Sequence, residues 1–144
     1  MLNLKPILLV EDDSVDVMAV QRVLKDLKVA NEIAYAGDGE AALAYLRCPD
    51  HETPCVILLD LNMPKMNGLE FLEALRADEA LKDILVVVVT TSPDQQDRAR
   101  SFELGVVAYI IKCSSYSEFR ESMMAITSYL AAARPTEKLE PARV

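Results

Sequence analysis

The sequence has no hydrophobic run long enough to span a membrane. Its longest unbroken aliphatic stretch runs from Ile84 to Val89, whereas a membrane-spanning helix needs about 20 apolar residues. The N-terminal stretch lacks the basic region of a secretory signal peptide and leads directly into Glu11, Asp12 and Asp13. Three cysteines without regular spacing give no disulfide framework. We therefore expect a cytoplasmic protein with reduced thiols and no contact with a membrane.

The sequence also has few basic residues. The 144 residues include 15 Lys and Arg against 23 Asp and Glu, a net charge of −8. Because DNA selects basic surfaces, this balance argues against DNA as a direct partner. It favours a basic partner or a divalent cation instead. With 51% hydrophobic residues, the chain can build one core but is too short for two ordinary domains.

Short apolar runs alternate with amphipathic stretches along the chain. The runs predict five strands, at Ile7–Val10, Glu32–Ala36, Val56–Leu59, Leu85–Val89 and Val107–Ile111. Between them, apolar residues recur at the i, i+3 and i+4 spacing of helices. Strict alternation favours right-handed βαβ crossovers. We predict an α/β fold: a single doubly wound, flavodoxin-like (βα)5 domain whose five-stranded parallel sheet has the order 2-1-3-4-5.

Local signals mark where the predicted helices start and stop. The predicted start residues are Ser14, Asp38, Asn67 or Gly68, Ser92-Pro93 and Ser115. Ser115 and Glu118 form a capping-box pattern, and Gly105 falls where the fourth helix should end. Residues 134–144 are polar and contain two prolines, so we expect a flexible tail after a domain of residues 1–133. We therefore expect no output domain in these 144 residues.

Polar groups follow four of the five predicted strands. Glu11 and Asp12 follow the first, Asp60 the third, Thr90 the fourth and Lys112 the fifth. In an open parallel sheet, ligands bind beyond the carboxyl ends of the strands where the strand order reverses. Three carboxylates would repel one another there unless a cation were present, and Mg²⁺ prefers oxygen ligands. Asp60 could then accept a phosphoryl group, with Lys112 and Thr90 around its oxygens.

Each of these residues also has an ordinary explanation by itself. An aspartate after a strand is usually a turn former or helix cap, and a lone lysine is usually a solvated surface charge. Threonine is common in strands. It is improbable that all five residues stand at the ends of the correct strands for unrelated structural reasons. We therefore favour one shared functional site.

The same residues resemble the bacterial response-regulator receiver domains over roughly Lys5 to Ala132. Glu11-Asp12 stands where that family has its acidic pair, and the stretch from Asp60 to Gly68, DLNMPKMNG, fits the family pattern D-x-x-M-P-x-x-x-G. Thr90 and Lys112 also lie at the spacing the family expects. The resemblance implies that Asp60 is the phosphorylation site and takes its phosphoryl group from a phosphohistidine of a sensor histidine kinase.

The resemblance further implies a metal site. Asp12 and Asp60 would bind Mg²⁺ directly, the backbone carbonyl of Asn62 would be a further ligand, and Glu11 would act largely through a water. Mn²⁺ is the alternative ion. Without an output domain, we expect a stand-alone phosphorelay switch that signals to a downstream protein by conformational change, and not a turnover enzyme.

Other positions match residues that switch the family and set its phosphoryl lifetime. Thr90 and Lys112 would bind the phosphoryl oxygens. Movement of Thr90 would let Tyr109 turn inward and remodel the surface of the fourth helix, fifth strand and fifth helix, although Tyr109 could also be a simple packing residue. Asn62 and Ser92 would flank the path of the hydrolytic water.

Two departures from the family pattern are visible. Cys113 replaces the usual cis-proline after the lysine, where a cis bond would cost about 3 kcal/mol, so we expect a trans path or a strained turn. The segment from Cys48 to Thr53 is also longer than in a minimal receiver. Together with Thr90-Thr91-Ser92, these features are similar to single-domain regulators that accompany phytochrome-type sensor kinases. That resemblance also implies a homodimer.

Three alternatives stay open at this point. A haloacid-dehalogenase-like phosphatase would also form an aspartyl-phosphate, but its D-x-D pattern needs an acid where Asn62 stands. A degenerate interaction module would keep the fold and take no phosphate, which Cys113 favours and the complete site disfavours. Cys48, His51 and Cys55 offer three ligands that zinc accepts, although a fourth is not evident.

Overall fold

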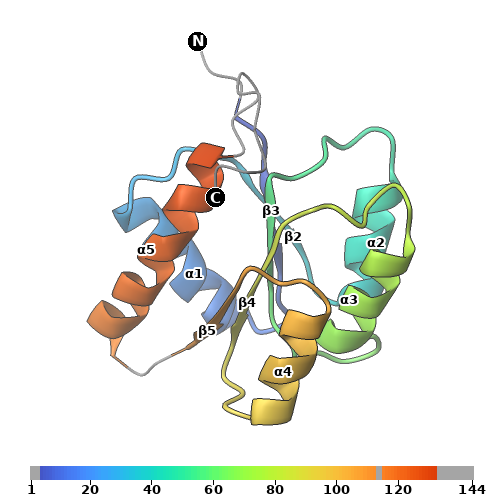
Figure 1. Ribbon diagram of the computed structural model, residues 1–144. Helices are drawn as coiled ribbons and strands as arrows, with labels where there is room; N and C mark the ends of the chain where they lie inside the picture. Colours follow the sequence, from blue (N-terminus) through green and yellow to red (C-terminus); the bar gives the residue numbers. More distant parts are fainter. Residues whose placement is uncertain (1–3, 113–114, 133–144) are drawn as a thin grey trace.

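A five-stranded parallel sheet lies between two layers of helices (Figure 1). The computed structural model describes residues 4–112 and 115–132. The strands are β1 (Ile7–Val10), β2 (Ile33–Ala36), β3 (Val56–Leu59), β4 (Val86–Thr90) and β5 (Ala108–Ile111). Their order is β2-β1-β3-β4-β5 and every pair is parallel. The predicted fold class and strand order are therefore confirmed. Residues 134–144 and the Lys112–Cys113 bond lie outside the described residues.

Four helices connect the strands and a fifth follows β5. They are α1 (Ser14–Asp26), α2 (Gly39–Arg47), α3 (Gly68–Ala77), α4 (Gln95–Glu103) and α5 (Tyr116–Ala132). Figure 1 shows α1 and α5 on one side of the sheet, with α2 and α3 on the other and α4 beyond β4. Within the described residues, no helix is both long and apolar enough to cross a membrane.

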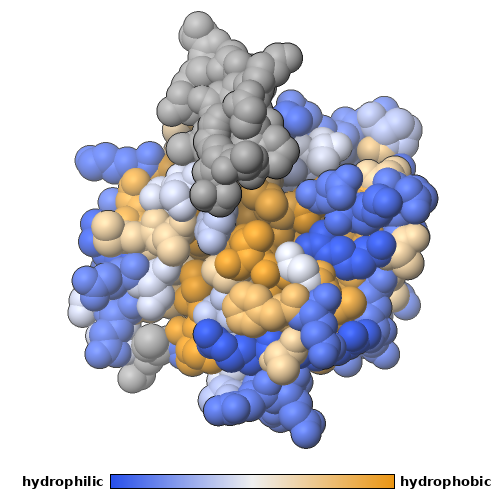
Figure 2. Space-filling view, viewed as in Figure 1, coloured by the Kyte–Doolittle hydropathy of each residue, from blue (hydrophilic) through white to orange (hydrophobic). Residues whose placement is uncertain are grey.

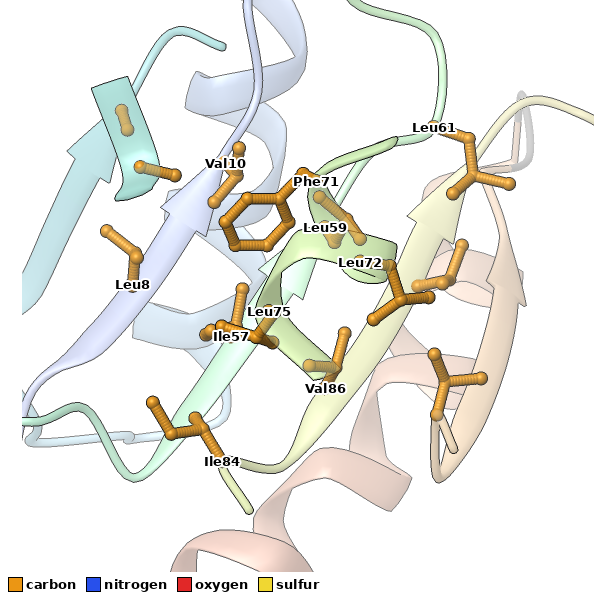
Figure 3. Packing of buried hydrophobic residues seen from close by; sticks show 14 of the residues in the cluster. Leu8, Val10, Ile57, Leu59, Leu61, Phe71, Leu72, Leu75, Ile84 and Val86 are labelled. Carbon is orange, nitrogen blue, oxygen red and sulfur yellow. The ribbon is translucent and has the colours of Figure 1, made fainter. Parts of the chain in front are cut away.

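Alternation along the strands divides the core into two halves. Leu8 and Val10 of β1 point to the side of α2 and α3, whereas Ile7 and Leu9 point to the side of α1 and α5. In the first half, Phe71 of α3 lies over the sheet and is fully buried (Figure 3). Burying one such side chain contributes about 1.5–3 kcal/mol. Both faces of the sheet are thus covered, which leaves its ends free for a ligand.

The cap of α1 differs from the prediction. Asp13, and not Ser14, is the N-cap residue, because Asp13 has extended backbone angles while Ser14 is already helical. One carboxylate oxygen of Asp13 accepts hydrogen bonds from the backbone N–H of Val15 at 2.8 Å and of Asp16 at 3.3 Å. Adjacent serine and aspartate are both good caps, so composition does not distinguish them.

The start of α4 was also predicted too early. Asp94 is the N-cap residue and accepts a 2.7 Å hydrogen bond from the backbone N–H of Gln96. Ser92 and Pro93 therefore lie before the helix, and the Ser92 hydroxyl donates to Asp97 at 2.8 Å. At the other end, Gly105 has φ +86°, in keeping with the predicted stop.

Three other predicted starts agree with the structure. Asp38 is the N-cap residue of α2 and accepts a hydrogen bond from the backbone N–H of Ala41 at 2.8 Å. Asn67 and Glu70 form a complete capping box at the start of α3. Ser115 precedes α5, and its hydroxyl accepts from the backbone N–H of Glu118 at 3.3 Å. These caps fix where α3 and α5 begin beside the sheet.

Helix α4 is held weakly by comparison with the sheet. Ser101 is its one buried residue, and the helix is otherwise polar. Helices with few buried apolar contacts open or shift at low free-energy cost. The fold thus places a helix with little buried apolar surface after β4.

Candidate functional site

Five predicted site residues lie at the carboxyl ends of β1, β3, β4 and β5: Glu11, Asp12, Asp60, Thr90 and Lys112. Val10 pairs with Leu59 across β1 and β3, so the acids that follow these strands lie side by side. The Asp60 N–H donates to the Val10 carbonyl at 3.0 Å, and the Lys112 N–H donates to the Thr90 carbonyl at 2.8 Å. The parallel registers therefore place carboxylates and one ammonium at a single edge of the sheet.

Three carboxylates form a tight group at this edge. One oxygen each of Glu11, Asp12 and Asp60 lies within 4.8 Å of the other two. Glu11 and Asp60 are buried, while Asp12 is exposed to solvent. Among the described residues this is the one group of three acidic, histidine or cysteine side chains with ligand atoms so close together. Crowded oxygens of like charge fit a divalent cation such as Mg²⁺.

Asp60 carries the clearest sign of a missing ligand. Its Oδ1 atom is buried and has no hydrogen-bond partner. The nearest cation is the Lys112 ammonium, whose Nζ lies 3.9 Å away, within ion-pair range but beyond a hydrogen bond. Since an unsatisfied buried polar oxygen costs about 1–3 kcal/mol or more, a folded protein seldom keeps one without a use. A cation or an incoming phosphoryl group would satisfy it.

Lys112 is instead held by two other carboxylates. Its Nζ donates to Glu11 Oε1 at 2.5 Å and to Asp16 Oδ2 at 2.9 Å. Asp16 lies in the first turn of α1, and it was missed in the sequence analysis. Its position one turn into the helix that follows the acidic pair was the available signal, but the contact depends on how α1 lies over the sheet edge.

Burial and pairing shift the two pKa values at this contact. Burial raises the pKa of Glu11 from 4.5 to about 7, against the opposing hydrogen bond from Lys112. Burial acts to lower the pKa of Lys112, but its hydrogen bonds to Glu11 and Asp16 outweigh this, so the pKa is raised. The ammonium therefore stays charged, while Glu11 can exchange a proton near neutral pH.

Gly68 allows α3 to lie against the backbone of Asp60 and Leu61. A Cβ atom at this position would lie 2.4 Å from the Asp60 carbonyl oxygen and 2.6 Å from the Leu61 Cα. The Gly68 N–H also donates to the Leu61 carbonyl at 3.0 Å. Asn62 lies between these anchors with its side chain exposed at the rim. The close approach thus fixes the loop that carries Asp60.

The predicted switch residues are linked through Ser92. Thr90 is fully buried, and its Oγ1 accepts from the Ser92 N–H at 3.3 Å. Tyr109 is 8% exposed and donates from its hydroxyl to the Ser92 carbonyl at 3.0 Å. Burial is the main cause of its raised pKa. The guanidinium of Arg98, in α4, lies 5.3 Å from the Tyr109 ring centroid, so the chain of contacts reaches from β4 to α4.

The residues of the zinc hypothesis have other neighbours. The His51 ring stacks on Tyr45, with centroids 4.0 Å apart. Cys55 is buried, and its thiol donates to the Lys5 carbonyl at 3.7 Å. Cys48 precedes a loop and is half-buried. These contacts give His51 and Cys55 structural roles without an ion.

Comparison with known proteins agrees with this geometry. The family model of the response regulator receiver domain matches residues 7–124. The chain belongs to this family. The receiver domain is 39% identical to the response regulator Rcp1 of Synechocystis over 87% of this chain and 88% of that protein.

Two solved structures are similar to the receiver domain. One is the phosphorylated cyanobacterial phytochrome response regulator RcpA, with a TM-score of 0.82, 35% identity, and coverage of 93% of this chain and 100% of that one. The other is the Mn²⁺-bound form of Rcp1, with a TM-score of 0.80, 37% identity, and coverage of 94% of this chain and 99% of that one.

Proposed function

We propose that Asp60 of this receiver domain accepts a phosphoryl group from a phosphohistidine of a sensor histidine kinase. The observation that carries the proposal is the buried, unpartnered Oδ1 of Asp60 beside two further carboxylates and one ammonium. Membership of the receiver family supports the same chemistry. The domain then signals through a conformational change in its protein contacts.

We propose that the acidic group holds Mg²⁺, with Mn²⁺ as the alternative. Asp12, Asp60 and the backbone carbonyl of Asn62 would be direct ligands, and Glu11 would act through a water. Similarity to a receiver whose crystal structure contains Mn²⁺ supports this assignment. When bound, the cation supplies positive charge that neutralises the oxygens of the transferring group.

The protein's own residues carry out the transfer. A carboxylate oxygen of Asp60 attacks the phosphorus, the phosphorus–nitrogen bond to the donor imidazole breaks, and the bonding electron pair leaves with the imidazole. The Lys112 ammonium, held 3.9 Å from Asp60, needs only a small movement to pair with a phosphoryl oxygen. Thr90, at the end of β4, donates its hydroxyl to another. Asn62 and Ser92 flank the approach of the hydrolytic water.

The response begins at Thr90 and ends on the surface of α4, β5 and α5. If the Thr90 hydroxyl turns to the phosphoryl group, Ser92 loses the acceptor of its N–H bond. Ser92 also holds the hydroxyl of Tyr109, so both residues rearrange, and the weakly buried α4 can follow. Phosphorylation adds about 1.5–2 negative charges to drive this shift.

Hydrophobic side chains gather on this surface. Figure 2 shows them around β5, between α4 and α5, and the exposed apolar residues include Phe102 of α4, which is 42% exposed. We propose this surface as the contact with a downstream protein. The similarity to RcpA, a phytochrome response regulator, supports a phytochrome-type kinase as the partner. We further propose a homodimer, and a cytoplasmic switch that does not turn over external substrates.

Acetyl phosphate with Mg²⁺ tests the central proposal without a kinase. The wild-type chain should gain one base-labile phosphoryl group by intact mass, and Asp60→Asn should gain none. In the same samples, amide NMR signals of Tyr109 and α4 should shift in the wild type alone. Phosphorylation of Asp60→Asn to the same extent, or steady hydrolysis of small phosphate esters by the wild type, would contradict the proposal.

A further inference from the structure

Asp16 is a fourth carboxylate at the site, outside the group that fits a cation. Its Oδ2 accepts a 2.9 Å hydrogen bond from Lys112 Nζ, and its side chain is 33% exposed. Lys112 is far more buried, with 10% of its side chain exposed. The contact thus joins the first turn of α1 to the residue that follows β5, across the mouth of the site.

Capping does not account for this contact. An acid in the first turn of a helix is commonly favoured by the helix dipole. In α1, however, Asp13 already accepts from the free N–H groups of Val15 and Asp16. The carboxylate of Asp16 accepts from neither of these N–H groups and is directed to Lys112 instead.

We propose that Asp16 is a positioning residue that keeps Lys112 off the acceptor oxygen until a phosphoryl group arrives. The inference rests on the proposed phosphorylation of Asp60. Glu11 and Asp16 hold the ammonium at 2.5 and 2.9 Å, and Asp60 Oδ1 stays 3.9 Å away without a hydrogen bond. A carboxylate oxygen that already accepts a short bond from an ammonium has a less available lone pair and is a weaker nucleophile.

Removing the charge of Asp16 changes the balance around Lys112. In Asp16→Asn, Glu11 and Asp60 are the charged partners that remain. Lys112 Nζ must move only about 1 Å to reach hydrogen-bond distance of Asp60 Oδ1, from 3.9 to about 2.9 Å. That oxygen is buried and unsatisfied, so it attracts the ammonium strongly. The expected result is an acceptor oxygen that is blocked before the donor binds.

The experiment measures phosphorylation of the full chain by acetyl phosphate and Mg²⁺. The maximal rate of Asp16→Asn should fall about two- to fivefold, the size of one partly exposed ion pair. The half-saturating acetyl phosphate concentration should not change, because the proposed role of Asp16 acts through Lys112 on the Asp60 oxygen. Asp16→Glu keeps the charge and should restore most of the rate. Asp26→Asn makes the same change at the far end of α1 and should match the wild type.

A crystal structure of metal-free Asp16→Asn gives a second readout. Lys112 Nζ should lie within about 3.2 Å of Asp60 Oδ1. An unchanged rate, an equal loss in Asp16→Glu, or an ammonium that stays at its wild-type distance from Asp60 would overturn the inference while leaving phosphorylation of Asp60 intact. A wild-type chain that takes no phosphoryl group would overturn both.

Discussion

Substitution of Gly68 by alanine tests whether the close approach of α3 fixes the acceptor loop. The new Cβ would lie 2.4 Å from the Asp60 carbonyl oxygen, where real Cβ contacts stay above about 3.0 Å. Helix α3 or the Asp60–Leu61 backbone must therefore separate by about 0.6 Å, even before the Leu61 Cα at 2.6 Å is relieved. Both atoms belong to the backbone, so no side-chain rotation can remove the overlap.

The expected cost follows from this overlap. Overpacking of a well-packed contact typically costs about 1–3 kcal/mol. Replacing glycine also lowers the conformational entropy of the unfolded chain, which stabilises the folded state by about 0.4–1 kcal/mol. The net loss in the free energy of unfolding should therefore lie between about 0 and 2.6 kcal/mol. Because displacement of a reacting group by about 1 Å can cost a hundredfold in rate, a smaller shift of Asp60 should slow phosphorylation about tenfold.

Urea unfolding and phosphorylation by acetyl phosphate measure the two effects. Gly37→Ala is the matched control, since a Cβ there meets nothing within 4 Å and its φ lies outside the left-handed region. Gly37 also follows a strand at the same edge of the sheet. The control should equal or exceed the wild type in stability and keep its rate. Equal stability and equal rates for Gly68→Ala and Gly37→Ala would refute the packing argument.

Two further predictions concern charged groups. In metal-free protein, the pKa of Glu11 is about 7 in the folded state and 4.5 in the unfolded state. The free energy of unfolding should therefore fall by up to about 3 kcal/mol as the pH rises through that window. Urea unfolding at several pH values measures this slope, and Glu11→Gln should remove most of it. Arg76 donates from its guanidinium to the carbonyls of Leu104, Lys82, Ile84 and Gly105. Arg76→Met should cost roughly 2–3 kcal/mol of stability, whereas Arg47→Met, which loses one exposed ion pair, should cost under about 1 kcal/mol; equal effects would contradict the assignment.

The sheet could be predicted from sequence because its strands are short aliphatic runs buried on both faces. Leu58 and Val87, for example, are fully buried, as expected for strands of a parallel sheet that helices cover on both faces. The same periodicity fixed which residues follow each strand, so Asp60 and Lys112 could be placed at one edge. The helix caps were less predictable, because Asp13 and Ser14 are adjacent and either side chain could be the N-cap of α1.

Asp16 could not be predicted in the same way. Its contact with Lys112 joins residues 96 positions apart and depends on the angle at which α1 crosses the sheet, which no local pattern encodes. The free Oδ1 of Asp60 was likewise out of reach, because a list of site residues does not say which of them are paired. The sequence predicts which residues lie at the site, and the structure adds which of them contact one another.

That pairing explains why the site suits both a proton and a cation. Glu11, Asp16 and Asp60 form ion pairs with the Lys112 ammonium, and Asp12 lies beside Glu11 and Asp60. Four carboxylates against one ammonium give the site an excess of negative charge when no metal is bound. Uptake of a proton by Glu11 near pH 7 relieves part of that repulsion. Since a divalent cation relieves the same repulsion, it must compete with this proton, and its affinity should weaken as the pH falls below about 7. The excess negative charge of the site thus favours binding of a divalent cation most at pH values above about 7, where Glu11 has lost its proton.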